Sequence, residues 1–170
     1  SAPTGMVRAM TGFDSGQFRK VLGHFPTGVT VVTAAPDGIP VGLTIGSFTS
    51  VSLDPPLVGW LPGKGSTSWP DIHRAGVFCV NVLAADQGDL CWRFAKDLDD
   101  KFEGVGWTAG PTGSPVLEGV LAWIDCTIEH VIDGGDHDFV MGRVVDLHAV
   151  RHDVGPLLFF KGKLGDFSPI

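Results

Sequence analysis

The chain has 170 residues, 44% of them hydrophobic and 18% charged, and a formal net charge of -7 at pH 7. This length is typical of one domain, and the negative charge argues against a nucleic-acid partner, because binding phosphate backbones requires a basic surface. No apolar run approaches the roughly 20 residues of a membrane-spanning helix, so we expect no membrane partner either. Frequent glycine (24 residues) and proline (12 residues) favour short strands and turns over a helical bundle.

The N-terminal segment and the cysteines predict where the protein is found. Residues 1–12 lack the charged-then-apolar layout of a signal peptide and are expected to form a flexible leader, followed by a single domain over residues 13–170. Cysteines are odd in number (Cys79, Cys91 and Cys126), and Cys79 and Cys126 lie within apolar strand patterns. This predicts buried thiols instead of a disulfide framework or metal site. Together these features predict a soluble cytoplasmic protein.

The first half of the chain predicts one helix and then strands. Asp14 followed by Gln17 resembles a capping box that opens a helix continuing to about His24. Residues 29–35 and 40–47 are expected to be strands joined by a turn at Asp37-Gly38. The apolar face of the helix, expected to pack inward, consists of Phe18, Val21, Leu22 and Phe25.

The remaining elements are mostly short strands. Strands are expected at residues 57–61, 77–83, 122–132, 139–150 and 157–160, short helices at residues 72–75 and 85–95, and a long connection at residues 102–115. In residues 122–132 the alternation places Ile124, Cys126, Ile128 and Ile132 on one face, and Asp125, Thr127 and Glu129 on the other. Hairpin-linked strands with two or three short flanking helices predict a mainly β fold, a closed or split antiparallel barrel. A doubly wound parallel sheet is the alternative, but it needs helices after residue 100, where none is predicted.

Residues 63–68, with the sequence GKGSTS, combine one cation, Lys64, with three hydroxyl groups and flexible backbone. Such a loop can bind an anion such as a phosphate. Ser68 is predicted as the N-cap of the following helix, with Pro70 and Asp71 in its first turn. The P-loop pattern does not fit, because Lys64 is followed by glycine. A solvated loop is the alternative, and composition alone favours it.

Several motifs together identify a family. They are FPTGVTVVT at residues 25–33, PVGLTIGSF at 40–48, SVSLDPPL at 50–57, FCVNVL at 78–83, DKF at 100–102, GDH at 135–137 and PLLF at 156–159. In order and spacing they resemble the short-chain flavin reductase family, the reductase components of two-component flavin-dependent monooxygenases, over residues 18–164. The resemblance implies a split β-barrel of the flavin-reductase, FMN-binding type that forms a homodimer. It also implies NAD(P)H-dependent reduction of FMN or FAD for a separate oxygenase component.

The resemblance also implies site residues. The isoalloxazine ring of the flavin would be lined by Pro40, Val41, Gly42, Leu43, Thr44, Gly46 and Ser47. The flavin phosphate would be held by Leu61, Pro62, Lys64, Thr67 and Ser68, and Arg93 and Phe94 would reach the flavin across the pocket. Gly135, Asp136 and His137 match the nicotinamide motif, with His137 as the catalytic side chain that orients the nicotinamide or stabilises charge beside the flavin. Gly46 offers no side-chain hydrogen bond, which leaves the choice between FMN and FAD open.

Alternatives remain at the level of the sequence. No arginine cluster suggests a site for the 2′-phosphate of NADPH, which favours NADH. His130, Asp133, Asp136 and His137 could be metal ligands by residue type, but they are spread over a hairpin, so no metal is predicted. A non-catalytic flavin-binding protein and a pyridoxal-phosphate oxidase-like barrel could share the architecture. The Gly135-Asp136-His137 motif favours the reductase over both.

Overall fold

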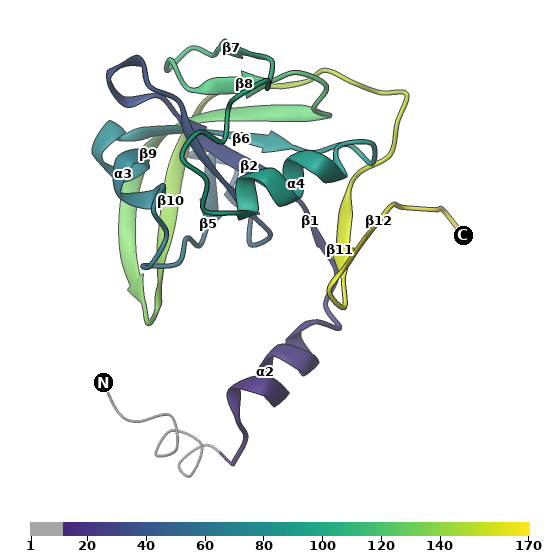
Figure 1. The fold of residues 1–170 in the computed structure, drawn as a ribbon. Coiled ribbons are helices and arrows are strands. Elements are labelled where there is room, and N and C mark those ends of the chain that lie inside the picture. Colours follow the sequence, from purple (N-terminus) through teal and green to yellow (C-terminus); the bar gives the residue numbers. More distant parts are fainter. Residues whose placement is uncertain (1–11) are drawn as a thin grey trace.

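A seven-stranded sheet forms the centre of the computed structural model, which describes residues 12–170 (Figure 1). All neighbouring strands in it are antiparallel, in the order β3-β2-β6-β9-β10-β5-β4. The strands are β2 (Thr30–Ala34), β3 (Val41–Ile45), β4 (Thr49–Ser52), β5 (Leu57–Trp60), β6 (Val77–Val82), β9 (Ala122–Gly134) and β10 (His137–Ala149). The long hairpin of β9 and β10 is the central element of the fold.

Smaller elements surround this sheet. Two further antiparallel sheets contain β7 (Trp107–Ala109) with β8 (Pro115–Leu117), and β1 (Thr27–Gly28) with β11 (Leu158–Phe160) and β12 (Lys163–Gly165). The helices are α2 (Ser15–Leu22), the 3₁₀ helix η1 (Pro36–Gly38), α3 (Trp69–Ala75) and α4 (Gly88–Ala95). The predicted class, a mainly β split antiparallel barrel with short helices, is confirmed. The doubly wound alternative is wrong, since every strand pair in residues 12–170 is antiparallel.

Local sequence signals set most of the boundaries. The Asp14 side chain accepts a hydrogen bond from the Gln17 N–H at 2.8 Å, as the predicted cap requires. Asp37 and Gly38 both have positive φ (55° and 78°), which gives the tight turn between β2 and β3. Gly76 ends α3 in the left-handed conformation (φ 72°). The strands β4 and β12, and the β7–β8 hairpin inside the predicted connection, were not predicted.

Ser68 is the N-cap residue of α3, as predicted, but its side chain does not cap the helix. Its backbone is already helical (φ -86°, ψ -28°), and its hydroxyl donates to the Gly42 carbonyl at 3.0 Å. Ser66 replaces it, because the Ser66 hydroxyl oxygen accepts from the N–H groups of Ser68 and Trp69, both at 3.3 Å. The helix therefore begins three residues after the residue whose side chain caps it.

Two predicted apolar faces do not lie where the periodicity placed them. The face of α2 is exposed, and in Figure 1 the helix projects away from the sheet, so within residues 12–170 it packs on no core. Ile132 is 50% exposed because it lies near the tip of the β9–β10 hairpin, beyond the rest of the sheet. Asp125, predicted on the outer face, is fully buried because the β7–β8 turn covers it.

The core has two parts, one on each side of the central sheet. One is built around Trp60, Phe78 and Val140, and the other packs Phe94, Leu117 and Val120 beneath α4 and β8. All three cysteines are buried and free, as predicted for Cys79 and Cys126. Burial raises the pKa of the Cys126 thiol to about 12, so it stays protonated and behaves as a small apolar side chain.

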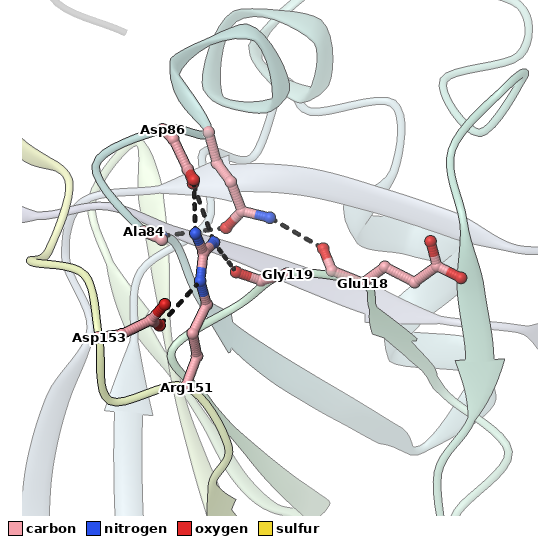
Figure 2. Close-up of polar contacts among 7 residues, drawn as sticks. Ala84, Asp86, Glu118, Gly119, Arg151 and Asp153 are labelled. Carbon is pink, nitrogen blue, oxygen red and sulfur yellow. Dashed lines mark hydrogen bonds and ion pairs between the residues drawn. The ribbon is translucent and has the colours of Figure 1, made fainter.

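A cluster around Arg151 fastens the C-terminal segment to the sheet (Figure 2). The Arg151 guanidinium donates to both carboxylate oxygens of Asp86 and to the Gly119 carbonyl at 2.9 Å, and it lies 3.6 Å from Asp153. Gln87 links the same two turns, accepting from the Ala84 N–H and donating to the Glu118 carbonyl. These contacts position the segment that leads into β11.

Asp125 carries a buried carboxylate that fastens the β7–β8 turn. The Thr112 N–H donates to Oδ2 and the Thr112 hydroxyl donates to Oδ1, both at 2.7 Å. Burial is the largest influence and raises the pKa of Asp125 above its ordinary value. The carboxyl therefore stabilises the fold most below the ordinary aspartate pKa of about 3.9, and that contribution is lost as the pH rises through the raised folded-state pKa.

We therefore expect Asp125→Asn to gain stability relative to the parent chain as the pH rises from about 4 to 7. The amide can accept from the Thr112 N–H and donate to the Thr112 hydroxyl oxygen, so the turn stays attached. Urea unfolding of both proteins across this range measures the difference. A constant difference in unfolding free energy would contradict the expected titration.

Thr112→Val, which removes the hydroxyl donor, is expected to cost about 1–3 kcal/mol.

Candidate functional site

Two adjoining clefts open beside β3. The larger, about 550 Å³, lies between β3 and residues 97–102, and the smaller, about 350 Å³, lies between β3, residues 65–67 and the end of α4. Thr67, Asp97 and Lys101 line both. The predicted residues Pro40, Val41, Gly42, Thr67 and Ser68 line the larger cleft, and Leu43, Thr44, Thr67 and Phe94 line the smaller. Most of the predicted ring-lining and hydroxyl residues therefore meet in one groove.

The β3 wall of this groove is fixed from behind by α4. A side chain at Gly42 would meet the Phe94 ring and the Val32 carbonyl oxygen, each 3.2 Å from an added Cβ, so only glycine allows the helix to pack so closely. Phe94 itself is 1% exposed. The Thr44 hydroxyl donates to the Cys91 carbonyl of α4 at 2.6 Å. Phe94 thus supports the wall from the core side and does not project into the groove as a free ring.

A second group of predicted residues meets where residues 61–64 run along the β9–β10 turn. The Ser47 hydroxyl oxygen accepts from the Leu61 N–H at 3.0 Å. The Pro62 carbonyl accepts from the Asp138 N–H at 3.0 Å, and the Lys64 N–H donates to the Asp136 carbonyl at 2.9 Å. The loop is therefore attached to the hairpin at successive backbone positions, which brings the predicted phosphate and nicotinamide segments together.

His137 opens β10 and forms a β-bridge with Gly63. The turn before it uses Gly135 at φ 86°, a conformation that favours glycine. The His137 Nδ1 lies 2.8 Å from the Asp136 carboxylate, and this hydrogen bond lowers the pKa of Asp136. The side chain is about half exposed, at 48%. His137 is thus oriented by its neighbour but remains accessible. It lines neither cleft.

Lys64 is already paired. Its amine donates to the Asp133 carboxylate of β9, and this hydrogen bond raises the pKa of Lys64 and lowers that of Asp133. Asp136 and Asp138 add further negative charge nearby. Lys64 therefore holds the loop on the hairpin, in addition to the role in phosphate binding predicted for it. Gly46 is exposed beside Thr27.

Arg93 is not brought to the groove. Its Nε donates to the Lys101 carbonyl at 2.7 Å, and its Nη2 donates to the Glu103 carbonyl. It borders a separate cleft of about 320 Å³ with Asp89 and Glu118. Arg93 thus anchors the main chain of residues 101–103 instead of facing the β3 wall.

Lys101 is the groove residue that sequence reasoning missed. It lines both clefts, and its amine donates to the carbonyls of Gly42 and Phe94 at 3.1 and 3.2 Å. The available signal was the DKF motif at residues 100–102, which contributed to the family resemblance without a role for Lys101. In residues 12–170 no three His, Cys, Asp or Glu side chains are placed to hold a metal ion.

Comparison with known proteins identifies relatives over nearly the whole chain. The family described as "Flavin reductase like domain" matches residues 22–168. The reductase subunit HsaB of a flavin-dependent monooxygenase from Rhodococcus jostii is 50% identical over 161 residues, 95% of this chain and 82% of the relative. The FMN reductase (NADH) SmoA of Agrobacterium fabrum is 44% identical over 157 residues, 92% and 88% of the two chains.

A solved structure agrees with these matches. The crystal structure of a nitrilotriacetate monooxygenase component B homologue from Mycobacterium thermoresistibile superposes with a TM-score of 0.87. It is 46% identical in sequence, and the match covers 91% of this chain and 87% of that one. The fold and most of the chain length are therefore shared with these proteins.

Proposed function

This chain belongs to the flavin reductase-like domain family and is of the type that forms the reductase component of two-component flavin-dependent monooxygenases; we propose that it binds FMN or FAD in the groove beside β3 and reduces it with NADH. The observation that carries the proposal is the groove itself. Its apolar wall at β3 faces hydroxyl groups and an ammonium across a space of the size that binds small cofactors. Reduced flavin would then pass to a separate oxygenase component.

The residues present suit a flavin. Val41, Gly42 and Leu43 offer a wall for the ring, and Thr67 offers a hydroxyl donor for the phosphate. Lys64 lines neither cleft and precedes Gly65, which lines the smaller one. A bound flavin supplies the hydride-accepting ring, so the chain needs to contribute mainly orientation. His137, held by Asp136 above Gly63, is the proposed contact for the nicotinamide.

NADH is favoured over NADPH by charge. The rim of the larger cleft carries Asp71, Asp97, Asp99 and Asp100, and these carboxylates would repel a 2′-phosphate. The relative from Agrobacterium fabrum is itself named an NADH-dependent FMN reductase.

Mixing the protein with NADH or NADPH and either FMN or FAD tests the reductase function. We expect the nicotinamide absorbance to fall with NADH and either flavin, and to fall slowly with NADPH. The alternative is a non-catalytic flavin-binding protein on the same barrel. That protein would bind FMN and leave NADH unoxidised, so flavin binding without NADH oxidation would overturn the reductase proposal.

A homodimer is proposed from the exposed face of α2. Phe18, Val21 and Leu22 are 53%, 59% and 52% exposed, and Phe25, which follows the helix, is 74% exposed. A contiguous apolar face of this kind typically marks a protein interface. In residues 12–170 no helix is long and apolar enough to cross a membrane.

Sedimentation of the parent chain and of Val21→Glu tests the dimer. A charge at the centre of the face is expected to convert a dimer into a monomer, because an unpaired buried charge strongly opposes association. Lys20→Glu, a charge change on the same helix outside the apolar set, is the matched control and should remain dimeric. A parent chain that sediments as a monomer would contradict the proposal.

A further inference from the structure

The Lys101 side chain lies where the two clefts join, and its contacts are all to neutral groups. The amine donates to the carbonyl oxygens of Gly42 and Phe94 and lies 3.4 Å from the Ser68 hydroxyl. Arg93 fixes the Lys101 main chain through its carbonyl. The ammonium is therefore positioned at the β3 wall by both its side chain and its backbone.

Within the described residues, the Lys101 ammonium forms no ion pair with a carboxylate. Among the described residues, Lys64, Arg74, Arg143 and Arg151 form ion pairs with carboxylates, and Lys101 forms none. Burial lowers the pKa of Lys101, and Asp97 acts in the opposite direction. A half-buried ammonium that faces only carbonyl and hydroxyl groups is incompletely compensated. An anionic group on a ligand would balance the positive charge of Lys101.

Asp97 already places a carboxylate in the same groove. Its Oδ1 accepts a hydrogen bond from the Thr67 hydroxyl at 3.0 Å, and both residues line the two clefts together with Lys101. The Thr67 hydroxyl and the Lys101 amine thus form a donor set for an anion, whereas the Ser68 hydroxyl already donates to the Gly42 carbonyl. The chain's own acidic side chain uses part of that set.

We propose that Lys101 supplies the positive charge that recognises the flavin phosphate, and that Asp97 competes with this phosphate for the Thr67 hydroxyl. The inference rests on the proposed function and goes beyond it, because it moves charge recognition from Lys64 to a residue in the loop after α4. Phosphate binding displaces Asp97 from Thr67. Lys64, matched by Asp133, contributes to the position of the loop and much less to phosphate charge.

Riboflavin, which has the same ring without the phosphate, separates these roles. Flavin fluorescence titrations without NADH give dissociation constants for FMN and riboflavin. Lys101→Met is expected to raise the FMN constant about tenfold or more, as for loss of a charge-assisted pair, and the riboflavin constant less than about threefold. Asp97→Asn is expected to lower the FMN constant several-fold and leave riboflavin unchanged.

Lys163→Met is the matched control, because it removes the same charge at an exposed lysine of β12 that lines neither cleft beside β3. It should change the FMN constant less than about threefold. Equal losses of FMN and riboflavin affinity in Lys101→Met would overturn the inference, and so would an equal FMN loss in Lys163→Met. If the parent chain oxidises NADH with FMN while Lys101→Met shows no phosphate selectivity, only this inference fails. A parent chain that binds neither flavin would end both proposals.

Discussion

His137→Ala is expected to lower kcat for NADH oxidation by about tenfold to a hundredfold, with little change in FMN affinity. The side chain stands at the tip of the β9–β10 hairpin, held by Asp136 at 2.8 Å and bridged to Gly63. It lines neither cleft beside β3, so its removal leaves the flavin wall intact. What is lost is the orientation of the nicotinamide relative to the ring. Stopped-flow measurement of NADH oxidation at saturating FMN gives this rate directly.

His130→Ala provides the control for this prediction. His130 lies on β9 of the same hairpin, is exposed, and pairs with Met141 next to an irregularity in the β9–β10 register. Its replacement should leave kcat within about twofold of the parent value. If His137→Ala turned over NADH as fast as His130→Ala does, His137 would have no part in hydride transfer.

The parts of the fold that could be predicted depend on near neighbours in the chain. Asp14 with Gln17, the Asp37-Gly38 turn and Gly76 each act within a few residues, so the sequence contains the whole interaction. The β3 wall could be predicted for a related reason, because its residues are consecutive. The motif resemblance then placed residues 40–44 and 61–68 in one site, and the structure brings most of them to one groove.

The parts that could not be predicted depend on distant contacts. Arg93 contacts the carbonyls of residues 101 and 103 because the chain reverses after α4, and no local pattern indicates that reversal. Lys101 belongs to a run of charges that periodicity treats as solvated, although its amine reaches Gly42 on another strand. Asp125 is buried only because a turn more than ten residues away covers it. The apolar stripe of α2 was recognised correctly, and within residues 12–170 it remains exposed.

Gly142→Ala is expected to destabilise the fold by about 1–3 kcal/mol, and Gly142→Val by more, through overpacking of the core. Gly142 is buried in β10, next to an irregularity in its pairing with β9. An added Cβ would lie 2.8 Å from Cε1 of the Phe78 ring and 3.1 Å from the Cys126 Cβ. Phe78 is fully buried and packs edge-on against Trp60, with 5.5 Å between ring centroids, so it cannot move without disturbing the core.

Urea unfolding of Gly142→Ala and Gly155→Ala measures this effect against a matched change. An added Cβ at Gly155 meets nothing within 4 Å and its φ is not positive, so that variant should stay within about 0.5 kcal/mol of the parent chain. Equal stability of the two variants would mean that the Phe78 side of the core can yield. Since β10 also begins at His137, a shift of this strand would move the hairpin tip, and a loss of kcat beyond the loss of folded protein is expected in Gly142→Val.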